Sequence, residues 1–166
     1  MKNKKILIIL AIVLIAIVVV ALLLLGTSSK YTEKYSSSEL YDLVKNSFET
    51  DGGTKILDSD VILEFTETDL DYLVDYTVVK ANNAKNINEI GIFKVKNGKA
   101  SELKKIVTDY LEDKQQIYRA MDYFPEEVEK IDCAKVTVYG NYVIYSFLNE
   151  ADTSAFYSAI ENLIKE

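Results

Sequence analysis

Acidic side chains crowd residues 58–75, and in this stretch the residue types come closest to a chemical site. Calcium takes about six to eight oxygen ligands, and carboxylates supply many of them. If residues 73–80 form a strand, Asp69, Asp71 and Asp75 project to one side, and these three are the candidate cation site. The spacing of the acidic residues does not match an EF-hand loop. A solvated acidic face is therefore the competing interpretation.

The composition removes the commonest routes to catalysis. The 166 residues include no histidine, so neither a Ser-His-Asp triad nor a Cys-His pair can form within the chain. Two carboxylates could hydrolyse a glycosidic bond, but they must be held at a set separation in a cleft. The single cysteine, Cys133, cannot form an internal disulfide, and it fits a small buried residue better than a reactive thiol. We expect no catalytic residue, no cofactor and no enzymatic activity.

The chain has twelve tyrosines, and two of them, in a predicted hairpin, offer a binding surface. A two-residue Gly-Asn turn joins residues 135–139 to residues 142–148. One face of this hairpin is apolar and is expected to be core. The other face carries Tyr139, Tyr142 and Ile144, and a mixed aromatic and aliphatic patch of this kind is typical of a protein interface. Ordinary cross-strand pairing, with partial cover by the preceding linker, is the competing interpretation.

Residues 6–25 are twenty consecutive apolar residues, and three lysines precede them. Twenty helical residues are about 30 Å long, which matches the hydrocarbon thickness of a bilayer. Positive flanks favour the cytoplasmic side. We therefore expect a cytoplasmic tail over residues 1–5, a single lipid-contacting transmembrane anchor over 6–25, a linker over 26–35 and an extracytoplasmic domain over 36–166. A cleaved signal peptide is the competing interpretation, although the apolar run is long for one and no Ala-x-Ala site ends it.

The charge of the chain excludes some partners. The net charge is −7, and three of the 19 basic residues precede the apolar run, which leaves 16 basic and 26 acidic residues beyond it and a net charge of −10 there. Nucleic-acid binders need a basic surface, so a nucleic-acid partner is not expected.

The remaining pattern predicts an α+β domain, because apolar stripes at helical spacing alternate with strand-like runs. The expected helices begin near residues 36, 101, 125 and 152, and the expected strands cover residues 73–80, 89–96, 135–139 and 142–148. Helices placed between antiparallel hairpins imply a two-layer domain, with a four-stranded, largely antiparallel sheet and helices packed on one face. The other face is then open or covered by a partner.

Four motifs occur in a set order along this domain: EIGIFKVKN at 89–97, a long helix with Tyr110 and Gln115, YFPEEVEKI at 123–131, and YGNYV at 139–143. In order and spacing they resemble the uncharacterised bacterial family called domain of unknown function 4358, over residues 38–165. The resemblance implies a membrane-anchored or lipid-anchored protein of the Gram-positive cell envelope. This chain lacks the cysteine that a lipid anchor requires. The family brings no known activity, so the resemblance assigns no role to any residue.

A binding role is the function that these features favour. We expect a single-pass protein of the cell membrane whose outer domain binds another envelope protein or a cell-wall component. The alternative is a small-ligand or metal-binding accessory domain that uses the acidic segment 58–75.

Overall fold

Two central strands with apolar residues on both faces organise the domain. The computed structural model describes residues 30–48, 54–56, 71–82, 85–121 and 125–166. The described elements follow in chain order: α2 (Ser37–Val44), β1 (Thr54–Ile56), β2 (Leu73–Lys80), β3 (Glu89–Val95), α4 (Ala100–Ala120), α5 (Pro125–Asp132), β4 (Lys135–Tyr139), β5 (Tyr142–Phe147) and α6 (Glu150–Ile164).

The strands form one antiparallel sheet in the order β1-β2-β3-β5-β4. The four predicted strands and both predicted hairpins are confirmed. In the second hairpin Tyr139 lies opposite Tyr142, and the turn between them includes Gly140 at a φ of 57°, a backbone conformation that favours glycine. The structure adds a fifth strand, because the short β1 pairs with β2.

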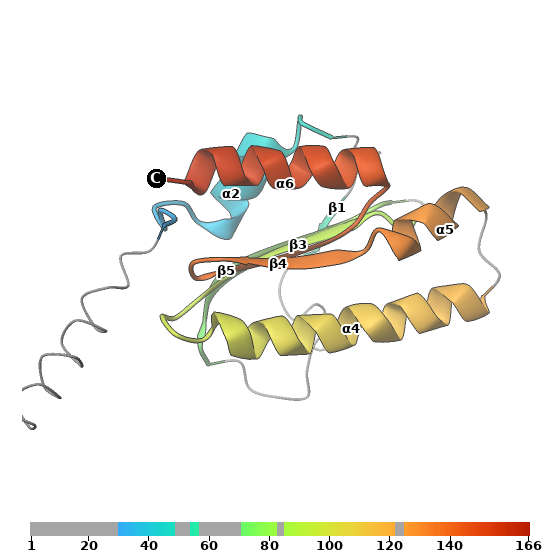
Figure 1. The fold of residues 1–166 in the computed structure, drawn as a ribbon, viewed down its shortest axis with the longest axis horizontal. Helices are drawn as coiled ribbons and strands as arrows, with labels where there is room; N and C mark the ends of the chain where they lie inside the picture. The colour runs from blue at the N-terminus through green and yellow to red at the C-terminus, as the bar shows by residue number, and fades with distance from the viewer. Residues whose placement is uncertain (1–29, 49–53, 57–70, 83–84, 122–124) are drawn as a thin grey trace, which may run out of the picture. The chain divides into compact units, whose positions relative to one another are not determined.

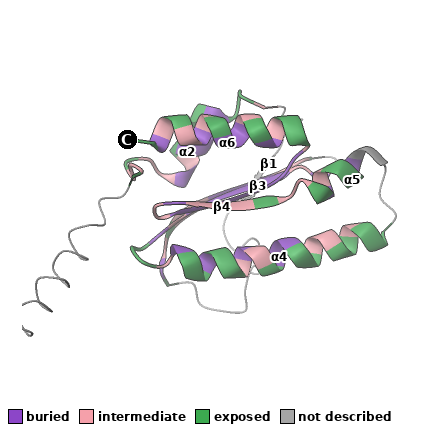
Figure 2. Ribbon diagram, viewed as in Figure 1, coloured by how far each residue is buried: buried purple, intermediate pink, exposed green. Residues whose placement is uncertain are grey.

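Helices cover both faces of the sheet, so the expectation of two layers with helices on one face is wrong. Figure 1 shows α2 and α6 on one side of the sheet and α4 on the other, with α5 at the end of the sheet. Ile131 of α5 belongs to the core cluster on the α4 side. Figure 2 shows the buried residues concentrated in the sheet between these two helical layers. The domain is therefore a three-layer α/β/α arrangement.

The physical reason for the third layer lies in β3 and β5, where almost every residue is buried. Apolar side chains alternate to opposite faces of a strand, so each face needs its own cover. Toward α4 and α5 the sheet contributes Val78, Phe93, Val95, Val143, Tyr145 and Phe147. Toward α2 and α6 it contributes Val79, Ile90, Ile92, Tyr139, Tyr142 and Ile144.

The first helix on the α6 side starts near residue 36 as expected, and it begins with a capping box. The Ser36 side chain accepts from the backbone N–H of Glu39, and the Glu39 carboxylate accepts from the backbone N–H of Ser36 at 2.8 Å. Both hydrogen bonds satisfy backbone donors that a helix start would otherwise leave unpaired.

Part of the predicted linker belongs to the folded domain. The compact unit begins at Tyr31, before the domain start expected at residue 36. Thr32 donates its backbone N–H to the carbonyl of Ile164 at 2.7 Å. The ammonium of Lys94 donates to the carbonyl oxygens of Glu33 and Tyr35 at 2.6 and 2.9 Å. These contacts hold the segment against the end of α6 and against β3.

The predicted membrane anchor over residues 6–25 lies outside the described residues. None of the helices in the described part of the chain has both the length and the apolar composition needed to cross a bilayer.

Candidate functional site

The three residues predicted as an exposed interaction surface are buried. Tyr139 is 7% exposed, and Tyr142 and Ile144 have no exposed surface. The ring of Tyr31 packs edge-on against Tyr139 at 5.2 Å, and the Tyr142 hydroxyl donates to the carbonyl of Tyr35 at 2.6 Å. The prediction of an open face is wrong because α2, α6 and the segment before α2 cover this side of the hairpin.

The candidate cation site lies only partly within the described residues. Asp69 lies outside the described residues, and Asp71 is exposed. Asp75 accepts the backbone N–H of Ser37 at 2.6 Å through its Oδ1 atom, so its carboxylate is engaged at the positive end of α2. Within the described ranges, no group of three or more Cys, Asp and Glu side chains could hold a metal ion.

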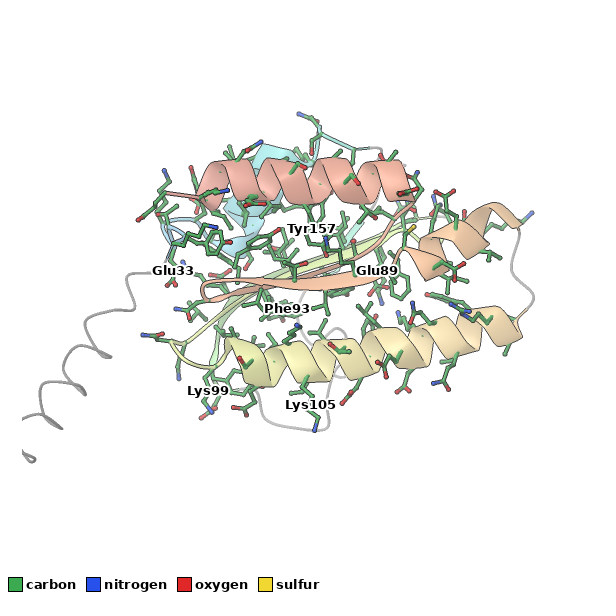
Figure 3. The ribbon with its side chains drawn as sticks, in the orientation of Figure 1. Glu33, Glu89, Phe93, Lys99, Lys105 and Tyr157 are labelled. Atoms are coloured by element: carbon green, nitrogen blue, oxygen red, sulfur yellow. The ribbon has the colours of Figure 1, made fainter. Side chains whose placement is uncertain are left out.

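A different carboxylate, Glu89, is the centre of the main buried polar cluster. Its side chain is only 3% exposed, at the start of β3. The hydroxyls of Tyr110 and Tyr145 each donate to its Oε1 atom at 2.5 Å. The ammonium groups of Lys114 and Lys80 lie 3.0 and 3.7 Å from its Oε2 atom. Three strands and helix α4 therefore meet at one carboxylate, and Figure 3 places Glu89 between the sheet and α4.

A glycine in β3 provides the space that this cluster needs. Gly91 lies directly opposite Tyr145 in the sheet, two residues after Glu89 on the same face. A Cβ at residue 91 would overlap the Tyr145 ring, with Cδ1 at 2.6 Å, Cζ at 2.7 Å and Cε1 closer still. The missing side chain lets the ring cross β3 and bring its hydroxyl to Glu89. This accounts for the Glu-x-Gly spacing of the EIGIF motif.

Aromatic packing fixes the two tyrosines. Phe93 stacks on Tyr145 with ring centroids 6.1 Å apart, and Tyr110 meets the Tyr145 ring edge-on at 5.7 Å. The ammonium of Lys114 also lies 4.7 Å from the centre of the Tyr110 ring, a distance suited to a cation–π contact. The ring positions are thus set by neighbours on the same face of the sheet.

The pairing of the buried Glu89 charge with donors from α4 and the sheet stabilises the packing of α4. Burial, and then the negative charge of Glu89, hold the pKa of Tyr145 well above its usual value, so its hydroxyl stays a donor at neutral pH. Two ammonium groups compensate the carboxylate, and both of its oxygens accept hydrogen bonds. A buried charge with this degree of pairing is tolerated, whereas an unpaired one is strongly unfavourable. The arrangement joins α4 to the sheet.

A second buried carboxylate attaches α5 to the loop before β3. Glu127 is 5% exposed and accepts the backbone N–H of Ile87 at 2.8 Å. Lys130 donates to Glu127 at 2.8 Å and to the side-chain oxygen of Asn86 at 3.1 Å. These contacts give a structural role to the acidic and basic residues of the YFPEEVEKI motif.

The sequence carries one signal for the Glu89 cluster besides the periodicity of the strand. Glu89 shares a strand face with Gly91, Phe93 and Val95, and the last two are apolar. A single charged residue on a face that is otherwise buried requires internal partners. Those partners are distant in sequence, so the position could be suspected but its environment could not be predicted.

The chain thus contains a three-layer α/β/α domain in which a buried glutamate joins a helix to the sheet. The family described as Domain of unknown function (DUF4358) matches residues 46–148, and the chain belongs to this family. The match begins after α2 and ends just after β5, so it covers the sheet, α4, α5 and both buried carboxylates. No protein of curated function and no solved structure matches the chain.

Proposed function

We propose that the chain is a membrane-tethered, non-catalytic binding domain that stands outside the cell membrane and docks another protein of the cell envelope. The observation that carries the proposal is the exposure of large apolar side chains at the C-terminal half of α4. Ile117 is 54% exposed and Met121 is 62% exposed.

These two residues lie one helical turn apart, so they share a face of the helix. They continue the apolar stripe of α4, whose N-terminal members Leu103 and Val107 are buried. Each of these side chains that a partner buries fully would contribute about 1.5–3 kcal/mol to the binding free energy through the hydrophobic effect. Val128 of α5 adds a third large apolar side chain that is exposed, at 42%.

The non-catalytic part of the proposal is supported by the use of the polar residues. Glu89 and Glu127 have internal donors on their carboxylates, and Asp75 is engaged by the start of α2. Each of these groups serves the fold. The acidic charge beyond residue 25 agrees with a solvated domain that stands away from anionic lipid.

The partner is tested by photo-crosslinking in cells that express the full chain. A photoreactive amino acid replaces Ile117 in one variant and Met121 in another, and Lys105 is the matched control. Lys105 is exposed on the same helix, and Figure 3 shows it pointing away from the sheet. We expect one recurrent adduct at residues 117 and 121 that is missing at residue 105. The same adducts at all three positions would contradict a docking surface on this face.

The location is tested with a cysteine at the C-terminus. In a Cys133→Ser background, Glu166→Cys should react with a membrane-impermeant maleimide in intact cells. Protection in intact cells, followed by labelling after lysis, would contradict an extracytoplasmic domain.

A further inference from the structure

The β4 strand is an edge of the sheet that is built regularly enough to accept another strand. It is the last strand in the order, and its register against β5 runs without a shift from Lys135 to Tyr139. Val136 and Val138 are only partly buried, whereas every residue of β5 is buried. In Figure 1 none of the described helices and strands lies in front of β4, which is drawn between α6 and α4. Edge strands are commonly shortened, bulged, interrupted by proline or protected by charged side chains. β4 has five residues, no proline and no register shift, and its one charged residue, Lys135, is at its first position.

The register shows which backbone groups of β4 point outward. A two-residue turn makes Tyr139 and Tyr142 a hydrogen-bonded pair, and bonded and non-bonded pairs alternate along an antiparallel ladder. Val138 and Val136 therefore direct their N–H and C=O groups away from β5. The pairing of β5 with β3 is consistent with this register. Val95 donates its N–H to the carbonyl of Asn141, so the alternation directs the N–H and C=O groups of Val143 toward β3 and away from Val138.

We propose that β4 pairs with β4 of a second copy of this chain, antiparallel and about a two-fold axis at Thr137. In this register Val136 lies opposite Val138 of the second copy, and the two pairs related by the axis form four backbone hydrogen bonds. The two sheets then become one continuous sheet. This inference does not depend on the docking surface at Ile117 and Met121.

The side chains of β4 favour a second copy over an unrelated strand, because the Lys-Val-Thr-Val-Tyr sequence complements itself. Toward α4, valine meets valine across the axis. Toward α6, Thr137 meets its own copy and Lys135 meets Tyr139 of the second copy. A Thr–Thr pair is among the favourable cross-strand pairs, and this register opposes no like charges. The chain beyond residue 25 has a net charge of −10, but β4 contains one charged residue, and it is basic. The edge is therefore a part of an acidic domain where two copies can meet with little repulsion.

A cysteine scan of the full chain in native membranes tests the register. In a Cys133→Ser background, Thr137→Cys should form a disulfide-linked dimer under mild oxidation. A directly opposed, non-hydrogen-bonded pair has its Cα atoms about 4.5 Å apart, within the range of about 4.4–6.8 Å that a disulfide needs. Val138→Cys, one residue away on the same strand, is the matched control, because its symmetry mate is displaced along the strand. Lys105→Cys, at an exposed position on α4, measures the dimer yield that random collision gives.

The expected result is a dimer yield at Thr137→Cys at least ten-fold above both controls. Equal yields at residues 137 and 138, no dimer at residue 137, or a link to a different protein would each overturn the proposal. A charge exchange gives an independent measurement. Thr137→Lys and Thr137→Glu should each reduce co-purification of two differently tagged copies. Co-expression of the two variants should restore it, because the opposed pair then carries opposite charges. Co-purification that both variants leave unchanged would also overturn it.

Discussion

The substitution Gly91→Ala tests whether the Tyr145 ring must cross β3 to reach Glu89. The new Cβ would lie 2.6–2.7 Å from Cδ1 and Cζ of the ring and closer still to Cε1, so the ring has to move. Overpacking of a core costs about 1–3 kcal/mol. If the ring turns away, the hydrogen bond to the buried carboxylate is also lost, and such a bond contributes about 1.5–3 kcal/mol. We therefore expect a loss of about 3–5 kcal/mol, a large part of a typical domain stability of about 5–15 kcal/mol.

The assay is urea unfolding of a fragment spanning Tyr31–Glu166, the compact unit of the chain. With an m-value near 2 kcal/mol/M, the midpoint should fall by about 1.5–2.5 M. The control is the same substitution in a Tyr145→Val background, where the ring is absent. There Gly91→Ala should be nearly neutral or slightly stabilising, because alanine restricts the unfolded chain more than glycine does. Equal losses in the two backgrounds, or a loss below about 0.5 kcal/mol in the wild-type background, would refute the reasoning.

Three further predictions concern the polar contacts. Asp75→Ala should lower the free energy of unfolding by about 1 kcal/mol, because α2 loses an acceptor at its start, while the exposed Asp71→Ala should change it by less than about 0.5 kcal/mol; equal effects in thermal unfolding would contradict this. Glu127→Ala should cost about 2–3 kcal/mol and speed amide hydrogen exchange at Ile87, whose N–H loses its acceptor; unchanged exchange would count against the contact. Burial raises the pKa of Tyr142 from 10.0 to about 12, so the folded state keeps a proton that the unfolded chain loses above pH 10. Stability from this group is complete below pH 10 and is lost as the pH rises through 12. Tyr142→Phe should flatten the fall in unfolding free energy over that range, and parallel curves for the two proteins would disprove it.

Local features of the fold were predictable because they depend on neighbours in sequence. The strand predicted over residues 73–80 has the bounds of β2, and the capping box at Ser36 and Glu39 is present. The start of the last helix was misplaced, because Asn149 is its cap and not Asp152. The order of hairpins and the turn after Tyr139 also followed from patterns a few residues long. These features require only backbone preferences, side-chain periodicity and a nearby hydrogen-bond partner.

The candidate sites show the opposite case. The alternation places Tyr139, Tyr142 and Ile144 together on one face of the hairpin, but it does not indicate that α2 and α6 cover that face. Alternation along a strand separates two faces, and when both are apolar it does not tell which one a helix will cover. The acidic pattern predicts Asp75 as a cation ligand, whereas in the structure its carboxylate accepts a backbone N–H from a helix start 38 residues earlier in the chain.

The element types, the antiparallel hairpins, the acidic charge, the absence of histidine chemistry and the membership of an uncharacterised family all follow from the amino-acid sequence. The tertiary structure alone decided that the sheet lies between two helical layers, and that Glu89 is a buried junction. The hydroxyls that bind Glu89 come from residues 21 and 56 positions away along the chain. Contacts at such separations depend on how whole elements pack, and the packing is chosen by the total apolar surface that both faces of the sheet must bury.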